Sequence, residues 1–290
     1  MKTLITGVSG QLGKALSGSL SGTEYLGVDA REMDITDPSA VERVMKGYQP
    51  DVVIHTAAYT DVDGAEANQE QAYRVNALGT QNVALACHNI GAAMALISTD
   101  YVFDGKTDRP FDEYDLPAPL NVYGKTKAAG EALARQHVGR LFIVRTSWLF
   151  GDGNNFVRTI LRVGYQQKTV KVVNDQFGCP TYTKDLAAAI IDLINTNHFG
   201  VYHVVNQGIT TWFDFAREIF RAAGAKPVDL IPQSTAELGR AARRPMFSAL
   251  NDNLLRLATG RVMRPWQDAL QEYLSADPVI RGLTDAATGS

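Results

Sequence analysis

The chain has 290 residues, and its 45% hydrophobic content is enough to fill the core of one large or two medium domains. With 28 Lys and Arg against 31 Asp and Glu, the formal net charge is -3, which disfavours a nucleic-acid partner. Two cysteines and five histidines do not provide a zinc cluster or a disulfide framework, so we expect no metal and a reducing, cytoplasmic location. No apolar run approaches the roughly 18 residues that span a bilayer, which predicts no membrane association.

Short apolar runs alternate with amphipathic stretches through the first half of the chain. We expect strands over 3–5, 25–28, 51–54, 94–98 and 142–145, and helices over 12–20, 40–48, 70–89 and after Val122. Strands that alternate with helices form a parallel sheet with helices on both faces. The pattern predicts an α/β fold, a doubly wound parallel sheet of the Rossmann type, over residues 1–150.

The alternation breaks after Trp148, where a glycine- and asparagine-rich segment follows. Short strands over 170–173 and 202–205 then mix with helices over 184–195 and 211–223. We interpret parts of 169–206 as extensions of the sheet, interleaved with a smaller mixed α/β substrate-binding cap that makes up most of 151–275. Residues 276–290 are rich in Ala, Asp, Thr and Gly, which predicts a flexible tail.

A glycine motif, Gly7, Gly10 and Gly13, lies between the first strand and the first helix. Glycine allows a sharp turn and a close approach to a pyrophosphate, whose charge is met by the N–H groups at the start of the helix. The spacing is GxxGxxG rather than GxGxxG, and the alternative is an ordinary tight turn. We predict that this loop, with Gln11 and Leu12, binds a dinucleotide.

Asp29 closes the second strand, sixteen residues after Gly13. A carboxylate there can accept hydrogen bonds from an adenosine ribose, which favours NADH, while the neighbouring Arg31 could pair with a 2′-phosphate, which leaves NADPH open. A helix cap or a loop contact is the alternative for Asp29. Further candidate cofactor residues are Asp34 and Ile35 after the second strand, and Ala57, Ala58 and Tyr59 after the third.

Tyr123 and Lys127 are four residues apart at the start of a predicted helix, and so share one face. An ammonium group beside a phenol favours the phenolate, and we expect it to lower the tyrosine pKa toward neutrality. A surface tyrosine beside a solvated lysine is the alternative. Thr99 ends the strand before this helix, at the sheet edge where doubly wound folds bind ligands. Ser98 is the rival hydroxyl, because neighbouring side chains of a strand face opposite ways.

These motifs resemble the extended short-chain dehydrogenase/reductase family over essentially residues 1–275. Four further segments, 98–105, 119–127, 145–148 and 174–181, resemble the dTDP-4-dehydrorhamnose reductases within it. The resemblance implies that NADPH or NADH reduces the C4 keto group of dTDP-4-dehydro-β-L-rhamnose to dTDP-β-L-rhamnose. It implies a catalytic set of Thr99, Tyr123 and Lys127, with Lys127 also holding the nicotinamide ribose.

The candidate substrate-binding residues lie in or near these motifs. Trp148 could lie against the sugar or the thymine, although a buried tryptophan often simply packs, and the resemblance favours ligand contact. Asp100 could contact sugar hydroxyls, and Asn155 and Arg244 could reach the diphosphate, although loop hydrogen bonds or a solvated helix face would also explain them. Arg244 belongs with Arg240 and Arg243 to the main concentration of positive charge.

Other functions of the superfamily are less consistent with these residues. A 4,6-dehydratase would by resemblance have Asp-Glu after the threonine, whereas Asp100 is followed by Tyr101. Another 4-ketoreductase or an epimerase stays open, as does a non-catalytic subunit similar to the methionine adenosyltransferase β subunit. Some relatives dimerise through acidic residues bridged by magnesium, one of them on the helix after the glycine loop. This chain has Lys14-Ala15 there, and we expect a monomer or a weak homodimer.

Overall fold

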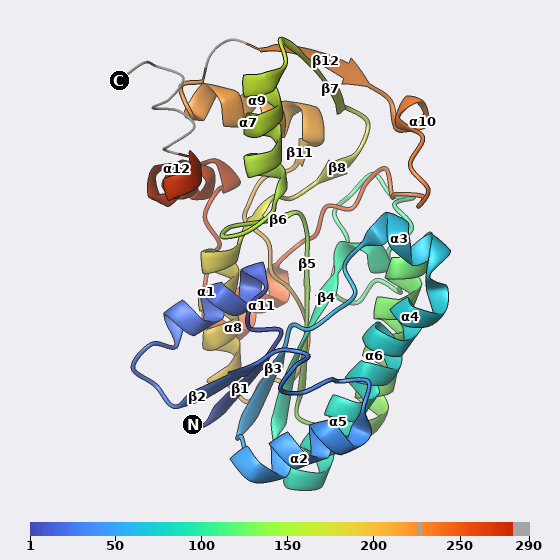
Figure 1. Ribbon diagram of the computed structural model, residues 1–290, viewed down its shortest axis with the longest axis vertical. Helices are drawn as coiled ribbons and strands as arrows, with labels where there is room; N and C mark the ends of the chain where they lie inside the picture. Colours follow the sequence, from blue (N-terminus) through green and yellow to red (C-terminus); the bar gives the residue numbers. More distant parts are fainter. Residues whose placement is uncertain (226–227, 281–290) are drawn as a thin grey trace.

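A six-stranded parallel sheet forms the centre of the computed structural model, which describes residues 1–225 and 228–280 (Figure 1). The strand order is β10-β5-β4-β3-β1-β2, and every neighbouring pair is parallel. The strands are β1 (Thr3–Thr6), β2 (Tyr25–Val28), β3 (Val52–His55), β4 (Ala93–Thr99), β5 (Leu141–Thr146) and β10 (Gly200–His203). The predicted doubly wound parallel fold is confirmed.

Helices cover both faces of this sheet, because side chains of alternate residues in each buried strand point to opposite faces. Ala95 and Ile97 pack with α1 (Gln11–Ser19), α8 (Thr183–Ile194) and α11 (Asn253–Thr259). Met94 and Leu96 pack with α2 (Pro38–Tyr48), α5 (Thr80–Ile90) and α6 (Val122–His137). Figure 1 shows the two helical layers on either side of the strands.

Local sequence signals set the ends of several of these helices. Asp37 caps α2 by accepting a hydrogen bond from the Ser39 amide, with Pro38 at the first helical position. Asn121 caps α6 through the Gly124 amide at 2.7 Å. Gly91 ends α5 with a φ of 73°, a conformation that glycine adopts without strain.

The helix predicted over 70–89 is divided in the structure. Helix α4 (Gln69–Tyr73) continues through a π-helical segment, η1 (Arg74–Gly79), into α5, and α3 (Val62–Ala67) precedes them. The buried Asn76 side chain binds both the amide and the carbonyl of Tyr59, and it also donates to the Thr126 hydroxyl. The π segment therefore ties the loop after β3 to α6, which fits the frequent use of such segments near functional sites.

A second layered region stands above the carboxyl ends of the sheet (Figure 1). Its apolar core includes Phe150, Leu161 and Phe215. It contains α7 (Phe156–Gln166), β7 (Thr169–Val173), α9 (Trp212–Ala222), β12 (Asp229–Gln233), α10 (Thr235–Leu238) and α12 (Trp266–Ala276). Two further two-stranded sheets are separate from the central one: β6 (Leu149–Phe150) with β9 (Thr181–Tyr182), and β8 (Phe177–Gly178) with β11 (Thr210–Thr211).

Two expectations about the second half differ from the structure. The strand at 170–173 does not extend the central sheet, because β7 pairs with β12, whereas β10 does extend it beside β5. The predicted tail also begins too early, since Asp277 is ion-paired with Arg158 and Ile280 is buried in the apolar core. Residues 281–290 of that tail lie outside the described residues. Within 1–225 and 228–280, no helix is both long and apolar enough to cross a bilayer.

Candidate active site

A cavity of about 590 Å³ opens at the carboxyl edge of the sheet, where the direction of winding reverses between β1 and β3. This is the place where doubly wound folds bind ligands, and the volume suits a small-molecule site. The sequence-predicted residues that line it are Gly7, Gly10, Gln11, Leu12, Asp29, Ala57, Ala58, Thr99, Asp100, Tyr123, Lys127 and Trp148. The structure thus brings cofactor, catalytic and substrate candidates into one space.

The glycine loop has a shape that side chains would prevent. Gly7 has a φ of +71°, and a Cβ on it would stand 2.9 Å from the Ala57 backbone. A Cβ on Gly13 would stand 2.3 Å from the Gly7 carbonyl oxygen, so Gly13 lies behind the loop and supports it rather than lining the cavity. Helix α1 starts directly after Gly10, with its first amides at the cavity. This cradle suits the pyrophosphate of a dinucleotide.

Asp29 stands beside this loop at the end of β2. Its Oδ1 accepts a hydrogen bond from the Ser9 amide at 3.2 Å, and its own amide donates to Glu32. The carboxylate is therefore fixed at the cavity, where a ribose hydroxyl could also reach it.

Several predicted cofactor residues lie elsewhere in the described chain. The Arg31 side chain is exposed, and Asp34 accepts hydrogen bonds from Thr36 in a turn. Ile35 is buried among core side chains, and the Tyr59 backbone is bound by Asn76. Their contribution to cofactor binding stays a prediction.

Helix α6 brings Tyr123 and Lys127 to the end of β4, where Thr99 stands. The helix approaches its neighbours closely at two glycines, which have no Cβ. A Cβ on Gly124 would be 2.1 Å from the Tyr101 carbonyl oxygen, and one on Gly130 would be 2.4 Å from the Asn76 carbonyl oxygen. Only glycine permits this distance. The three candidate catalytic side chains consequently face one cavity.

The pKa of Tyr123 differs from the expected direction. Its pKa is raised to about 12, chiefly by burial and also by the nearby Asp100, and a hydrogen bond from Thr99 only partly opposes this. The predicted lowering of this pKa by Lys127 is not found, because burial disfavours the phenolate. The Lys127 ammonium donates to the Ile97 carbonyl at 2.7 Å. Tyr123 is therefore a neutral phenol at pH 7, which is the form of a proton donor.

The pKa of Lys127 is itself lowered to about 8, because burial disfavours the ammonium form. The negative charge of Glu131 acts in the opposite direction and favours the ammonium. Lys127 is only 5% exposed, so its charge depends on these neighbours.

Of the two rival hydroxyls, Thr99 is the one placed beside Tyr123. Thr99 donates to Asp100 Oδ1 at 3.0 Å and accepts from the Tyr101 amide at 3.1 Å. Ser98 also borders the cavity, but its hydroxyl donates to Glu131 at 2.5 Å. The strand alternation explains this division.

Asp100 is buried next to the candidate catalytic residues. Burial raises its pKa to about 7, although hydrogen bonds from Ser248 and Thr99 act against this shift. An unpaired carboxylate is costly in such a place, so the folded protein retains the proton to a higher pH than the unfolded chain.

We expect Asp100→Asn to flatten the pH dependence of stability. The pKa of the wild-type carboxyl rises from 3.8 to about 7 on folding, so its favourable contribution is fully present below about pH 4 and is lost as pH rises to about 7. Relative to wild type, the variant should gain at most about 1.4 kcal/mol per pH unit across that window. Urea denaturation at several pH values measures this, and parallel curves for the two proteins would contradict it.

A pair of stacked tryptophans forms the wall near the second region. The rings of Trp148 and Trp212 are 3.7 Å apart at 10°, and both residues line the cavity. Trp148 has a φ of 47°, which is rare for a bulky residue and is typical of a conformation held by its surroundings. Gly178 makes room for it, because a Cβ there would lie 2.5 Å from the indole. Sequence reasoning missed Trp212, which is 64 residues away with no motif around it.

Arg244 is held by an ion pair and lies beside Tyr101, a residue that lines the cavity. Its two Nη atoms donate to the two carboxylate oxygens of Asp63, each at 2.9 Å, and Arg240 reaches the same carboxylate. These cations hold the pKa of Asp63 at about 2. The predicted contact of Arg244 with a diphosphate stays a prediction, while Asp63 is a partner that the sequence did not indicate.

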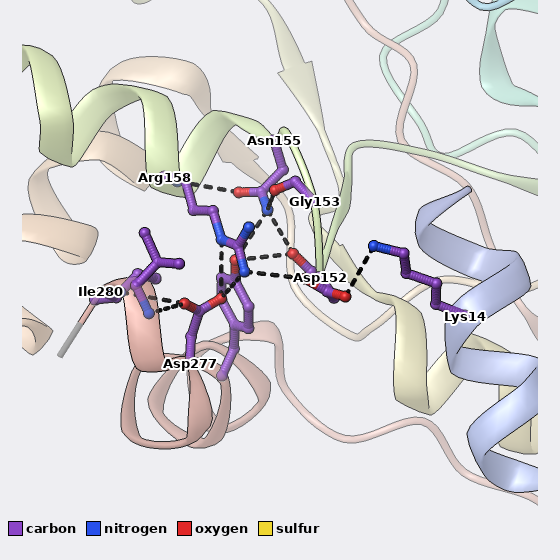
Figure 2. A network of polar contacts seen from close by, with 10 residues as sticks. Lys14, Asp152, Gly153, Asn155, Arg158, Asp277 and Ile280 are labelled. Atoms are coloured by element: carbon purple, nitrogen blue, oxygen red, sulfur yellow. Dashed lines mark hydrogen bonds and ion pairs between the residues drawn. The ribbon is translucent and has the colours of Figure 1, made fainter. Parts of the chain in front are cut away.

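The Asn155 side chain is hydrogen-bonded within the loop after β6 (Figure 2), and its predicted contact with the diphosphate stays a prediction. Its amide nitrogen donates to the Gly151 carbonyl at 2.6 Å and to the Tyr273 hydroxyl at 2.9 Å, and its oxygen caps α7 by accepting from the Arg158 amide. All of its polar atoms are used, so it supports the loop after β6.

The same view shows how this loop is tied to its neighbours (Figure 2). Asp152 pairs with Lys14 of α1 and with Arg158, each at 3.1 Å, and Arg158 also binds Asp277. Helix α1, which follows the glycine loop, is thus linked to the second region by a network of ion pairs.

Three buried residues, His55, Cys87 and Cys179, have pKa values that do not suit them to catalysis. His55 contacts the hydroxyls of Thr6 and Thr80, and burial lowers its pKa to about 3. Burial raises the pKa of both Cys87 and Cys179 to about 12, which leaves little thiolate for nucleophilic chemistry.

Comparison with known proteins identifies the family. The model of the RmlD substrate binding domain matches residues 1–278. The chain belongs to this family. The resemblance seen in the sequence is thereby confirmed, and the fold agrees with it.

Similar proteins include family members of nearly the same length. The spore coat polysaccharide biosynthesis protein SpsK of Bacillus subtilis (strain 168) is 41% identical over 94% of this chain and 96% of its own. The dTDP-4-dehydrorhamnose reductase of Mycobacterium tuberculosis H37Rv is 41% identical over 95% of this chain and 93% of its own. The crystal structure of Bacillus anthracis dTDP-4-dehydrorhamnose reductase in complex with NADP has a TM-score of 0.92 and 43% identity, covering 95% of this chain and 99% of that one.

Proposed function

We propose that this protein is an oxidoreductase that reduces the C4 keto group of dTDP-4-dehydro-β-L-rhamnose to dTDP-β-L-rhamnose, using NADPH or NADH. The product is the activated sugar for rhamnose-containing polysaccharides. The observation that carries this proposal is the convergence of Thr99, Tyr123 and Lys127 in one cavity beside the glycine loop. A protein that only bound a nucleotide would have no chemical use for a buried proton donor at this place.

The residues divide the reaction among them. When bound in the glycine cradle, the reduced dinucleotide supplies the hydride for the carbonyl carbon. Tyr123, which burial keeps protonated, donates its phenolic proton to the carbonyl oxygen. The Thr99 hydroxyl, whose proton is donated to Asp100 in the absence of substrate, turns to donate a hydrogen bond to the same oxygen. Lys127, as the family resemblance implies, holds the nicotinamide ribose. Together these steps convert the ketone to the alcohol.

The preference between the two cofactors depends on Asp29. Its carboxylate lines the cavity and favours a free ribose 2′-hydroxyl, hence NADH, whereas a relative binds NADP. We propose that the protein accepts either one.

The decisive experiment supplies the purified protein with dTDP-4-dehydro-β-L-rhamnose and each reduced cofactor. Nicotinamide absorbance should fall, and NMR should identify the sugar as L-rhamnose. Formation of 6-deoxytalose would reassign the protein to a neighbouring ketoreductase. A cofactor signal that is unchanged with either dinucleotide would reject the proposal and favour a binding role.

Trp212 is expected to support substrate binding through Trp148. Trp212→Ala removes one ring of the stack, so the KM for the sugar nucleotide should rise by about 10-fold, while dinucleotide affinity changes by less than about two-fold. Trp212→Phe keeps an aromatic surface and should stay near wild type. Steady-state kinetics and dinucleotide titration measure both values, and an unchanged KM in Trp212→Ala would show that the stack only packs.

We further propose that the protein works in the cytoplasm as a monomer or a weak homodimer. Lys14 occupies the place where some relatives carry an acidic metal ligand, and its ammonium pairs with Asp152 of the same chain at 3.1 Å. Light scattering with and without a chelator tests this, and a stable dimer that dissociates on chelation would contradict it.

A further inference from the structure

A third polar side chain follows Tyr123 and Lys127 along α6. Glu131 comes four residues after Lys127, and therefore lies on the same face of the helix, one turn farther from the cavity. It is 3% exposed and does not line the cavity in the described part of the chain. The proposed reduction makes no use of Glu131.

Glu131 binds two strands of the sheet at once. Its Oε1 accepts from the Ser98 hydroxyl of β4 at 2.5 Å and from Arg145 Nε of β5 at 3.0 Å, and its Oε2 accepts from Arg145 Nη2 at 2.7 Å. The residue before Ser98 is Ile97, whose carbonyl accepts from Lys127. Consecutive turns of α6 are thus fastened to consecutive residues of β4.

Stability alone does not account for this pair. Arg145 is 1% exposed, and the guanidinium lies 5.1 Å from the centre of the Phe103 ring. Taking two charges out of water offsets most of their mutual attraction, and apolar residues of similar volume would hold the helix as well. A buried charge pair one turn beyond a catalytic lysine therefore points to a function at that lysine.

We propose that Glu131 is a positioning residue for the proposed reduction: with Arg145 and Ser98 it sets the place of α6 on the sheet, and its charge keeps the Lys127 ammonium protonated. This inference rests on the proposed function for its effect on turnover. The expected effect of Glu131 on the pKa of Lys127 does not depend on the substrate.

The other groups around Lys127 do not provide a comparable negative charge. His55 of β3 is neutral at pH 7, because burial lowers its pKa to about 3. Arg145 of β5 is cationic, and Tyr101 follows β4 as a neutral phenol. Asp100 carries a raised pKa of about 7, and Glu66 of α3 binds the Val122 amide at the start of α6. Glu131 is therefore the negative charge that favours the ammonium form of Lys127.

Replacing Glu131 with glutamine removes the charge that favours the Lys127 ammonium. The pKa of Lys127 is about 8 with Glu131 present, so Glu131→Gln should lower it by about one unit. Because activity requires the charged lysine, the fall of kcat/KM at high pH should begin about one pH unit lower. A merely structural loss would reduce activity by a similar factor at every pH.

The test uses two readouts on the full-length protein. The first is the titration of Lys127 by NMR in ¹³C-lysine-labelled protein without substrate, with the signal assigned by Lys127→Arg. The second is the pH profile of kcat/KM with the keto-sugar nucleotide. Glu131→Asp retains the charge and should keep both titrations near wild type. Glu70→Gln removes the exposed partner of Arg74, also four residues away, and should change neither readout.

Glu131→Gln leaves Arg145 buried without its partner, and this can prevent folding. The double variant Glu131→Gln/Arg145→Met removes both charges. It should lower the Lys127 pKa by less than Glu131→Gln does, because losing the Arg145 cation acts in the opposite direction. If Lys127 has the same pKa in the variant that folds as in the wild type, the inference is overturned. A wild-type protein that does not turn over the keto-sugar would overturn the proposed function instead, and the NMR titration would still test Glu131.

Discussion

Replacing Tyr123 with phenylalanine is expected to lower kcat by at least about 10²-fold, because general acid catalysis contributes about 10² to 10⁴. In the proposed reaction the phenol is the proton donor, and burial holds its pKa at about 12, so the proton is available at any physiological pH. The ring itself remains in the variant and keeps its edge-to-face contact with Tyr101, with the ring centres 6.1 Å apart in wild type. The cavity should therefore keep its shape.

Dinucleotide binding distinguishes this loss from a general disruption. Titration by nicotinamide fluorescence should give a Kd for Tyr123→Phe within about two-fold of wild type, since the glycine cradle is untouched. Tyr114→Phe is a suitable control, because Tyr114 is 75% exposed and its hydroxyl contacts only Asp112 in the described chain. Near-normal turnover by Tyr123→Phe would show that the proton comes from elsewhere.

The sequence predicts the parts of the site that follow from local chemistry. A side chain at Gly13 would meet the backbone of its own loop, and one at Gly7 would meet the backbone after the neighbouring strand β3, so both positions require glycine. Tyr123 and Lys127 share a helical face whatever surrounds them. Thr99 follows from its place at the end of a strand. These predictions depend on spacing and on the parallel sheet, both of which are readable from the pattern.

The features that the sequence does not predict arise from contacts between distant segments. Trp212 meets Trp148, Asp63 meets Arg244, and β7 joins β12 only because the second region folds back over the sheet. The pKa of Tyr123 was expected to fall because a cation stands one turn away, but desolvation depends on burial, which spacing does not report. Charges and partners in this site are therefore properties of the tertiary structure.

Gly13→Ala is expected to weaken dinucleotide binding by at least about 10-fold and to lower the free energy of unfolding by about 1–3 kcal/mol. The added Cβ would stand 2.3 Å from the Gly7 carbonyl oxygen and 2.7 Å from the Val8 Cα. These are backbone atoms, so relief requires the loop to move away from α1. The amides that begin α1 would then no longer meet the pyrophosphate at the distance that the cradle sets.

Gly18 offers a matched control in the same helix. A Cβ there meets nothing within 4 Å, and the residue is exposed near the end of α1. Gly18→Ala should therefore stabilise the protein by about 0.5–1 kcal/mol, because alanine favours the helix, and should leave the Kd unchanged. Urea denaturation and dinucleotide titration of both variants compare the two positions directly. If Gly13→Ala bound the dinucleotide as tightly as Gly18→Ala, close packing behind the loop would not be what shapes the cradle.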